Sequence, residues 1–129
     1  MKVKGVDATY YTVRDLEKQT SFYSRLFGAA PDMEWDGRLS EWTFQDGSSF
    51  GLYRTEEAGN EPLSGGSVMF AVDDVAAAVA EAKQFGMKVN EHEGDSVMET
   101  PGCHMAFCQD LEGNHFILHH LKEACSNGK

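Results

Sequence analysis

The side chains best suited to catalysis or metal binding lie in the last third of the chain. His104, His115 and His119, with Glu99 or Cys103, carry the imidazole, carboxylate and thiol donors that divalent first-row metals prefer. On one strand, however, His115 and His119 would stand about 13 Å apart at about 3.3 Å per residue, so one ion cannot bind both. Without a metal, His119 and Glu99 are candidates for a general acid–base pair. A metal site and an acid–base pair therefore stand as alternatives.

Nucleophilic and phosphate-binding chemistry find no support in the sequence. Cys103 and His104 are neighbours on a predicted strand, so their side chains point to opposite faces. Cys108 lies in an apolar strand, which suits an inert packed thiol. The three cysteines lack CxxC spacing, which favours neither a disulfide framework nor a thiolate zinc site. Gly65 and Gly66 precede a predicted strand rather than a helix, the wrong context for a phosphate loop.

Charge and length exclude further classes of protein. The 129 residues carry 21 acidic against 11 basic side chains, and the net charge of −10 repels nucleic acid and anionic lipid. A chain of this length buries enough surface to fold without disulfides or a structural metal. No apolar run suits a signal peptide or a membrane span. We therefore expect a cytoplasmic protein that binds neither nucleic acid nor a membrane.

The first half of the chain predicts a strand, a helix and three more strands. Residues 6–13 are rich in Tyr, Thr and Val and alternate in character, as a strand does. Asp15 is the expected N-cap of a helix that starts at the next residue, and Gly28 is its expected C-terminal stop. Short strands follow at residues 33–35, 39–44 and 49–53, the last two joined by a turn at residues 46–47. Residues 56–66 have the composition of a surface loop or linker.

The second half repeats this order. Asp74 is the expected N-cap of a second helix, which we expect to end at Gly86. Strands are predicted at residues 67–72, 87–92, 103–109 and 115–121. The acidic segment 93–102 is predicted to be a loop, and residues 124–129 a frayed tail. A tight turn at residues 110–114, Asp-Leu-Glu-Gly-Asn, leads into the last strand.

Two alignments relate the halves. Residues 13–16 (VRDL) match residues 72–75 (VDDV) at an offset of 59, the separation of position 13 from position 72. The turn glycines Gly47 and Gly113 match at an offset of 66. Each of two such modules buries one face of its sheet under its helix and turns the other face elsewhere. A ligand is expected on that other face.

These motifs resemble the vicinal oxygen chelate superfamily, which includes glyoxalases, extradiol dioxygenases and bleomycin-resistance proteins. The resemblance rests on VRDL and VDDV, on Phe22-Tyr23 and Leu26-Phe27-Gly28, and on residues 110–114, which look like the family's DPxGN turn with Leu in place of Pro. It implies an α+β fold of two βαβββ modules, residues 6–60 and 67–122, in a single domain spanning residues 1–129. The family's sheets form a curved, half-open, barrel-like mixed sheet with the helices outside. The resemblance also implies a homodimer.

Metal-dependent members of the family carry ligands at positions that can be transferred to this chain. These positions are Ala8 and Ser67, which open the first strand of each module, and Gly51 and Ile117, four residues after the turn glycines. None is an ordinary metal ligand, Ser67 being at best a weak exception. We therefore expect neither a metal at these positions nor a cofactor.

Strand alternation predicts which side chains face the cavity that the resemblance implies. The ligand-binding candidates are apolar, aromatic, hydroxyl or imidazole side chains: Tyr10, Thr12, Tyr53, Ser67, Met69, His115, Ile117 and His119. Their aromatic and aliphatic members equally suit a solid core, since barrels of this size can be filled by side chains. Trp35 and Trp42 are either ligand platforms or core and dimer contacts.

Two functions follow from the resemblance and the missing ligands. The first is a metal-independent small-molecule binding protein of the glyoxalase/bleomycin-resistance type, which takes an apolar or aromatic ligand in the sheet cavity or dimer cleft. The acidic charge favours a cationic ligand. The second is a glyoxalase-like lyase or isomerase that uses a displaced metal site or a His/Glu acid–base pair. We favour the first, because the shared metal positions lack ligands.

Overall fold

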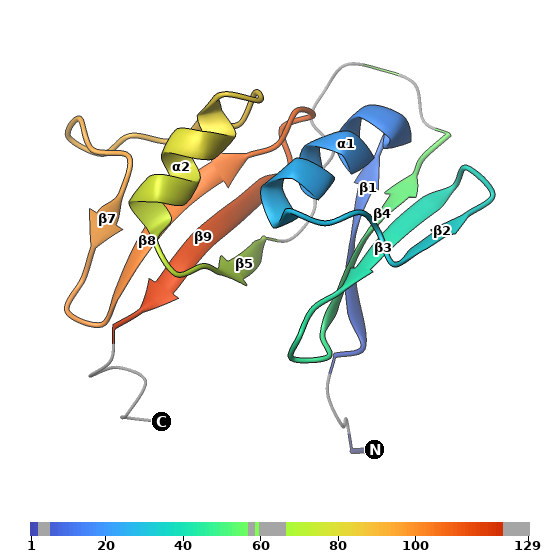
Figure 1. Cartoon of the computed structure of the whole chain (residues 1–129), viewed down its shortest axis with the longest axis horizontal. Coiled ribbons are helices and arrows are strands. Elements are labelled where there is room, and N and C mark those ends of the chain that lie inside the picture. Colours follow the sequence, from blue (N-terminus) through green and yellow to red (C-terminus); the bar gives the residue numbers. More distant parts are fainter. Residues whose placement is uncertain (3–5, 57–58, 60–66, 123–129) are drawn as a thin grey trace. The chain divides into compact units, whose positions relative to one another are not determined.

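The computed structural model describes residues 1–2, 6–56, 59 and 67–122. The chain forms two compact units, Met1–Gly65 and Gly66–Lys129, and Figure 1 shows a helix over one face of the sheet in each. Both sheets mix parallel and antiparallel strands. The predicted α+β fold is therefore confirmed. The prediction of a single domain with a half-open barrel concerns the placement of the units and stays a prediction.

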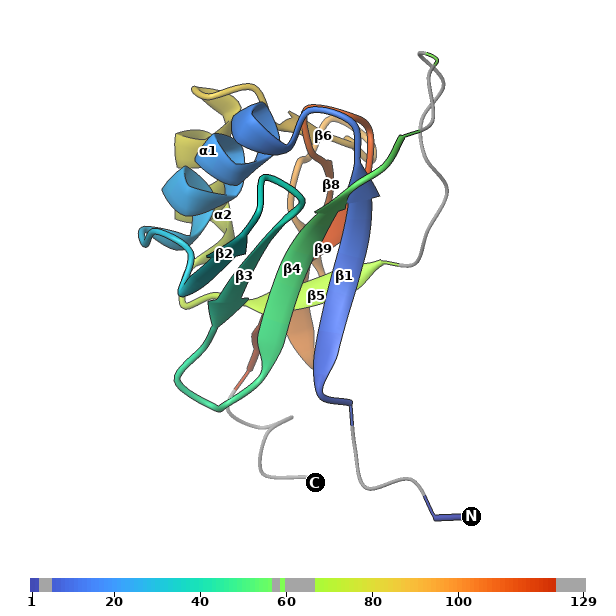
Figure 2. The same cartoon turned by 90° about the vertical axis from the view of Figure 1, so that its right-hand side faces the viewer.

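The first unit builds a four-stranded sheet in the order β1-β4-β3-β2, and Figure 2 shows these strands side by side. Strand β1 runs parallel to β4, and the other pairs are antiparallel. The elements are β1 (Ala8–Val13), α1 (Leu16–Phe27), β2 (Met33–Trp35), β3 (Leu39–Thr43) and β4 (Ser49–Arg54). Every element predicted for this half is present, with small shifts only at strand ends.

Helix α1 begins and ends where its sequence predicts. The Asp15 carboxylate accepts the backbone N–H of Lys18 at 3.0 Å, which satisfies a donor that the first helical turn leaves without a helical partner. Gly28 ends the helix at φ 69°, in the left-handed region that glycine enters without a Cβ clash. Local sequence signals therefore fix both ends of this helix.

An aromatic cluster forms the core of the first unit between α1 and one face of the sheet. Tyr23 and Phe27 of α1 meet Phe50 with ring centroids 5.1 and 5.7 Å apart. Trp42 lies 5.2 Å from Phe27 in an edge contact, and its Nε1 donates to the Ala29 carbonyl at 3.0 Å. The buried rings lie on the side of the sheet that α1 covers, and no helix within residues 6–56 covers the opposite face.

The second unit builds a five-stranded sheet in the order β5-β9-β8-β6, with β7 also paired to β8. The elements are β5 (Val68–Ala71), α2 (Val75–Lys83), β6 (Lys88–Val89), β7 (Met98–Glu99), β8 (Cys103–Gln109) and β9 (His115–Leu121). Two predictions were wrong: β7 lies in the segment predicted to be a loop, and α2 ends before Gly86. The edge strand comes in two pieces, because the chain leaves β8 after β6 and returns to it at β7.

Strand register confirms the internal repeat. Adding 59 to position 10 and 66 to position 51 gives positions 69 and 117. Tyr10 and Gly51 are parallel-strand partners in the first unit, and Met69 and Ile117 are parallel-strand partners in the second. The offset of 66 also converts the antiparallel pair Trp42–Phe50 into Cys108–Phe116, and these residues are partners as well. Positions in the two units can therefore be compared one by one.

The turns before β4 and β9 share one backbone pattern but differ in burial. In each five-residue turn, 44–48 and 110–114, the backbone N–H of the first residue donates to the carbonyl of the fifth residue. The N–H of the glycine at the fourth position donates to the carbonyl of the first residue, and all four distances are 2.8–3.1 Å. Only 2% of Asp110 is exposed, and its carboxylate accepts the backbone N–H groups of Glu112 and Asn114 at 2.9 Å. The Asp110 carboxylate thus holds the turn together.

No helix in residues 6–56 or 67–122 is long and apolar enough to span a membrane. The predicted tail, Cys125 and most of the predicted loop at residues 56–66 lie outside the described residues.

Candidate functional site

The sheet of the first unit has one face that α1 leaves uncovered, called here the first open face. Val13 and Leu52 point to the helix and are fully buried. Their neighbours along β1 and β4 point the other way. The predicted ligand-binding residues Tyr10, Thr12 and Tyr53 lie on this open face, and the register sets Thr12 directly opposite Tyr53.

The Tyr10 ring occupies the space that a side chain at position 51 would need. A Cβ built on Gly51 would lie 2.5 Å from two ring carbons of Tyr10. The Tyr10 hydroxyl donates to Oε1 of Glu41 at 2.6 Å, so the ring crosses β4 to reach β3. A phenol–carboxylate pair therefore fills one of the positions where the sequence comparison expected a metal ligand.

Burial and the neighbouring Glu41 carboxylate keep the Tyr10 phenol protonated. Burial of the hydroxyl, followed by the hydrogen bond and charge of Glu41, raises the pKa of Tyr10 to about 12. Tyr10 is therefore a neutral donor at physiological pH, and neither a base nor a phenolate ligand. Its acceptor, Glu41, places a carboxylate on the first open face.

Two further residues of the first open face, Met33 and Glu41, were missed by sequence reasoning. The β2–β3 register pairs Met33 with Glu41 and Trp35 with Leu39, which puts Met33 and Trp35 on this face. Met33 is 44% exposed and Trp35 57%. The alternation of Met-Glu-Trp in residues 33–35 indicates that Met33 and Trp35 share a face. Which face this is depends on the β2–β3 register, which the sequence does not give. Trp42, by contrast, is a core residue and not a ligand platform.

Several of the predicted ligand-binding side chains keep part of their surface exposed. Tyr10 keeps 39% of its surface exposed, Tyr53 44% and Met69 50%. None of the three side chains is buried, and their role in a ligand site stays a prediction. Ile117 is only half-buried.

The corresponding face of the second unit, the second open face, is mostly apolar. Met69 of β5 lies beside Ile117 of β9, which pairs with Phe107 of β8. His115 and His119 share this face with them by alternation. Ser67 lies just before β5 and is exposed. The predicted residues of this half therefore reach one face, and Ile117 occupies a position where a metal ligand would belong.

Of the residues considered for a metal site or an acid–base pair, the strands bring His104 and Glu99 together but keep His119 apart from both. His104 pairs with His120, whereas His119 pairs with Met105, so His104 and His119 point to opposite faces. Glu99 pairs with His104 and lies 3.4 Å from its Nε2. His119 therefore has neither Glu99 nor His104 as a neighbour. In the part of the chain that the structure describes, no three His, Cys, Asp or Glu side chains are arranged to hold a metal ion.

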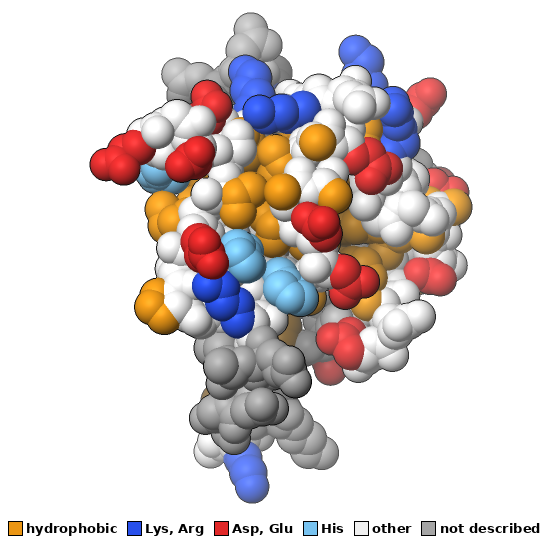
Figure 3. Space-filling view, turned by 60° about the vertical axis from the view of Figure 1, so that its left-hand side comes forward, with side chains coloured by type: hydrophobic (Ala, Val, Ile, Leu, Met, Phe, Trp, Pro, Cys, Tyr) orange, Lys and Arg blue, Asp and Glu red, His pale blue; other side chains and the backbone are white. Residues whose placement is uncertain are grey.

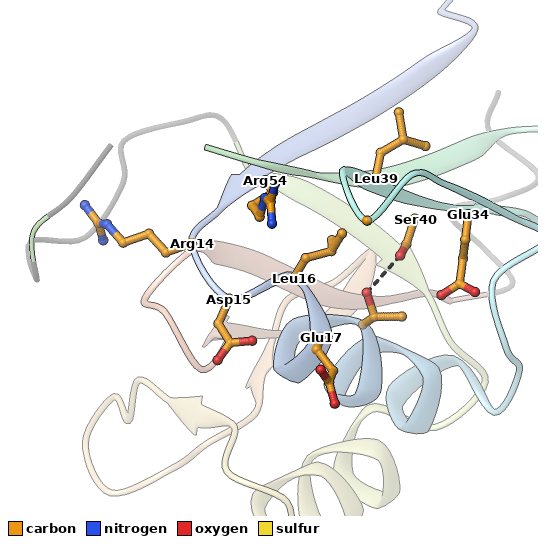
Figure 4. Close-up of a pocket in the computed structure, with 10 residues that line it drawn as sticks. Arg14, Asp15, Leu16, Glu17, Glu34, Leu39, Ser40 and Arg54 are labelled. Atoms are coloured by element: carbon orange, nitrogen blue, oxygen red, sulfur yellow. Dashed lines mark hydrogen bonds between the residues drawn. The ribbon is translucent and has the colours of Figure 1, made fainter. Parts of the chain in front are cut away.

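A cleft of about 720 Å³ opens in the first unit beside the start of α1 (Figure 4). Its lining comes from several elements: Arg14, Asp15, Leu16, Glu17, Thr20, Glu34, Gly37, Leu39, Ser40 and Arg54. The Thr20 and Ser40 hydroxyls are hydrogen-bonded at 2.9 Å in its wall. Carboxylates and guanidinium groups both line this cleft, so its charge selects no ligand class. No sequence motif predicted it, because its residues are scattered over residues 14–54.

The family profile described as Glyoxalase/Bleomycin resistance protein/Dioxygenase superfamily matches residues 5–118. The chain belongs to this superfamily. Membership confirms the resemblance inferred from the motifs.

Solved structures from the superfamily share the fold. A glyoxalase-related enzyme from Fulvimarina pelagi is 16% identical, with a TM-score of 0.72 over 92% of this chain and 88% of its own. A glyoxalase/bleomycin resistance protein from Albidiferax ferrireducens T118 is 18% identical, with a TM-score of 0.73 over 89% and 97%. A lactoylglutathione lyase from Agrobacterium tumefaciens is 19% identical, with a TM-score of 0.69 over 93% and 96%. No curated protein matches the sequence.

Proposed function

We propose that this superfamily member binds a small aromatic cation on the first open face, and that binding needs no metal. The observation that carries the proposal is the Tyr10 ring lying over Gly51 with its hydroxyl on Glu41. A metal-binding side chain at position 51 would collide with that ring. The same pair provides an aromatic surface and a carboxylate, which are groups that recognise an organic cation.

The remaining side chains of the face suit the same ligand. Tyr53 and Trp35 expose aromatic rings, whose faces attract cations, and Met33 adds an adaptable thioether. Glu41 supplies a negative group among them. The net charge of −10 further favours approach of a cation over an anion.

The test is a fluorescence titration with ethidium, an aromatic cation, on protein treated with a chelator. We expect saturable binding that chelation leaves unchanged, and no comparable binding of the aromatic anion 8-anilinonaphthalene-1-sulfonate. Trp35→Ala and Glu41→Gln should each weaken ethidium binding about tenfold, or about 1.4 kcal/mol. Glu17→Gln is the matched control, because it removes the same charge from α1 and should leave the affinity unchanged.

Two results would overturn the proposal. One is equal weakening by Glu41→Gln and Glu17→Gln, which would show only a general charge effect. The other is ethidium binding that disappears on chelation. A chelation-sensitive result would favour the alternative, a glyoxalase-like lyase or isomerase. The homodimer and the cytoplasmic location stay predictions, which light scattering and cell fractionation would check.

A further inference from the structure

The cleft beside the start of α1 carries charges of both signs, and the two signs lie apart. Strand register places Glu34 of β2 next to Ser40 of β3, and Ser40 next to Leu52 of β4. Arg54 follows two residues after Leu52, so β3 separates its strand from that of Glu34. Figure 4 shows Leu16 and Ser40 between Arg54 and Glu34. The sum of these charges selects no ligand class, but their positions do.

Two arginines hold a carboxylate at one end of the cleft. Nη1 of Arg38 and Nη2 of Arg54 both lie 3.7 Å from Oε1 of Glu56. This distance exceeds that of a hydrogen bond and the Glu56 side chain is 76% exposed, so the contact is weak. The Nε–H of Arg54 is buried and has no hydrogen-bond partner among the described residues. Because guanidinium groups bind carboxylates best through paired hydrogen bonds, Glu56 marks a position that a ligand carboxylate can take with better geometry.

A carboxylate of the protein lies at the other end. Glu34 is exposed on the edge strand β2, and it forms no ion pair within the part of the chain that the structure describes. Between the two ends, Leu16 is half-buried, and the Thr20 and Ser40 hydroxyls are already hydrogen-bonded to each other at 2.9 Å. The middle of the cleft therefore suits an aliphatic chain better than a strongly polar group.

The distance between the two ends limits the ligand. Neighbouring strands are about 4.8 Å apart, so β2 and β4 are separated by about 10 Å. A simple anion would also approach a protein of net charge −10, with acidic side chains scattered over the face that Figure 3 shows. A molecule that carries both charges has no net charge to be repelled, and it needs a chain to carry them to both ends.

We propose that this cleft binds a small ω-amino acid, which has a carboxylate at one end of an aliphatic chain and an ammonium group at the other. The carboxylate replaces Glu56 between Arg38 and Arg54, and the ammonium group pairs with Glu34. Alternation along β2 points Glu34 to the opposite side of the sheet from Met33, so the cleft is separate from the first open face. Neither the superfamily's ligand positions nor the proposed function uses it.

The experiment is a titration followed by backbone amide NMR, with 6-aminohexanoate, hexanoate and norleucine (2-aminohexanoate) as ligands. Norleucine has the same atoms as 6-aminohexanoate but carries its ammonium group beside the carboxylate. We expect 6-aminohexanoate to bind saturably and to shift the amide signals of Ser40 and Arg54, and the other two ligands to bind about tenfold more weakly. The absence of a saturable shift, or norleucine binding as tightly as 6-aminohexanoate, would overturn the site.

Variants test the two ends separately. Arg54→Gln should weaken 6-aminohexanoate binding about tenfold, and Glu34→Gln should weaken it several-fold without changing hexanoate binding. Glu56→Gln should strengthen binding several-fold, because it removes the competing carboxylate. Arg25→Gln is the matched control, since it removes the same charge from the last turn of α1, outside the cleft, and it should bind as the wild type does. Equal weakening by Arg54→Gln and Arg25→Gln, or weakening by Glu56→Gln, would contradict the proposal.

The variants also separate this site from other effects. Glu34 is an exposed residue of an edge strand, so Glu34→Gln tests the site even if a circular dichroism spectrum shows that Arg54→Gln fails to fold. Arg54→Gln should not weaken ethidium binding, and Glu41→Gln should not change 6-aminohexanoate binding. Failure of this site and failure of the proposed function can therefore be told apart.

Discussion

The two open faces have the same strand register but carry different side chains, partly polar on the first face and apolar on the second. At three equivalent positions the first face carries Tyr10, Gly51 and Glu41, and the second carries their counterparts Met69, Ile117 and Phe107. In the first unit, glycine leaves space for a phenol that reaches a carboxylate. In the second, an isoleucine fills the position itself. Equivalent backbone positions are thus filled in two ways, one polar and one apolar.

The faces that the helices cover also differ at an equivalent position, in the size of the buried side chain. Trp42 in the first unit corresponds to Cys108 in the second, and both are 1% exposed. The large indole contacts three aromatic rings, those of Tyr23, Phe27 and Phe50. Helix α2 instead covers its sheet with Val75, Val79 and Ala82. The equivalent core position is therefore filled by a much smaller side chain in the second unit.

The largest expected effect tests this difference in the cores. Trp42→Ala should lower the free energy of unfolding by about 3–5 kcal/mol, because it leaves a cavity among rings and removes the hydrogen bond to Ala29. Cys108→Ala should cost only about 1 kcal/mol. Urea unfolding followed by circular dichroism measures both. Equal losses would show that the equivalent positions do not differ in packing as described.

A middle-sized effect tests the contact between Tyr10 and Gly51. Gly51→Ala should destabilise the protein by about 1–3 kcal/mol, because the new methyl group collides with the Tyr10 ring. Tyr10→Ala in the same chain should recover much of this loss, and a double-mutant cycle measures the recovery. The equivalent pair in the second unit is the comparison. There we expect Met69→Ala to recover none of the stability that Ile117→Val loses. Strictly additive effects of Tyr10→Ala and Gly51→Ala would contradict the described contact.

The smallest effect is a shift in titration. The phenolate absorbance assigned to Tyr10, obtained by subtracting a Tyr10→Phe titration, should have its midpoint near pH 12, and Glu41→Gln should lower it. Because the folded pKa is above the unfolded value of about 10, the stability contributed by this pair is complete below pH 10. It is lost as the pH rises toward 12. A Tyr10 midpoint that Glu41→Gln leaves unchanged would remove the role given to Glu41.

Local and repeated features of the fold were predictable from the sequence. Asp15, Gly28 and Asp74 act on the residues next to them, so the caps follow from residue types alone. The offset of the turn glycines anticipated the register, because hairpin turns set strand pairing. Strand β7 was not predictable, since Met98 and Glu99 extend only by pairing with β8.

The candidate site was predictable only where one strand was enough. Alternation placed Tyr10 and Thr12 correctly, but Glu41 joins the site through a hydrogen bond between residues 31 apart in the sequence. The His104–His120 pair likewise depends on cross-strand register. Alternation along one strand grouped His115 with His119. It could not show which side chains of the neighbouring strand lie on the same face.

The divided edge strand of the second sheet has a consequence for assembly. Strand edges carry unpaired N–H and C=O groups that can pair with another molecule, and proteins commonly keep such edges short. Here β6 and β7 are two residues each, with the chain turned away from β8 between them. A foreign strand would find no straight run of backbone long enough to dock on. The interruption that hid β7 from sequence reasoning therefore makes this edge of the sheet a poor template for another strand.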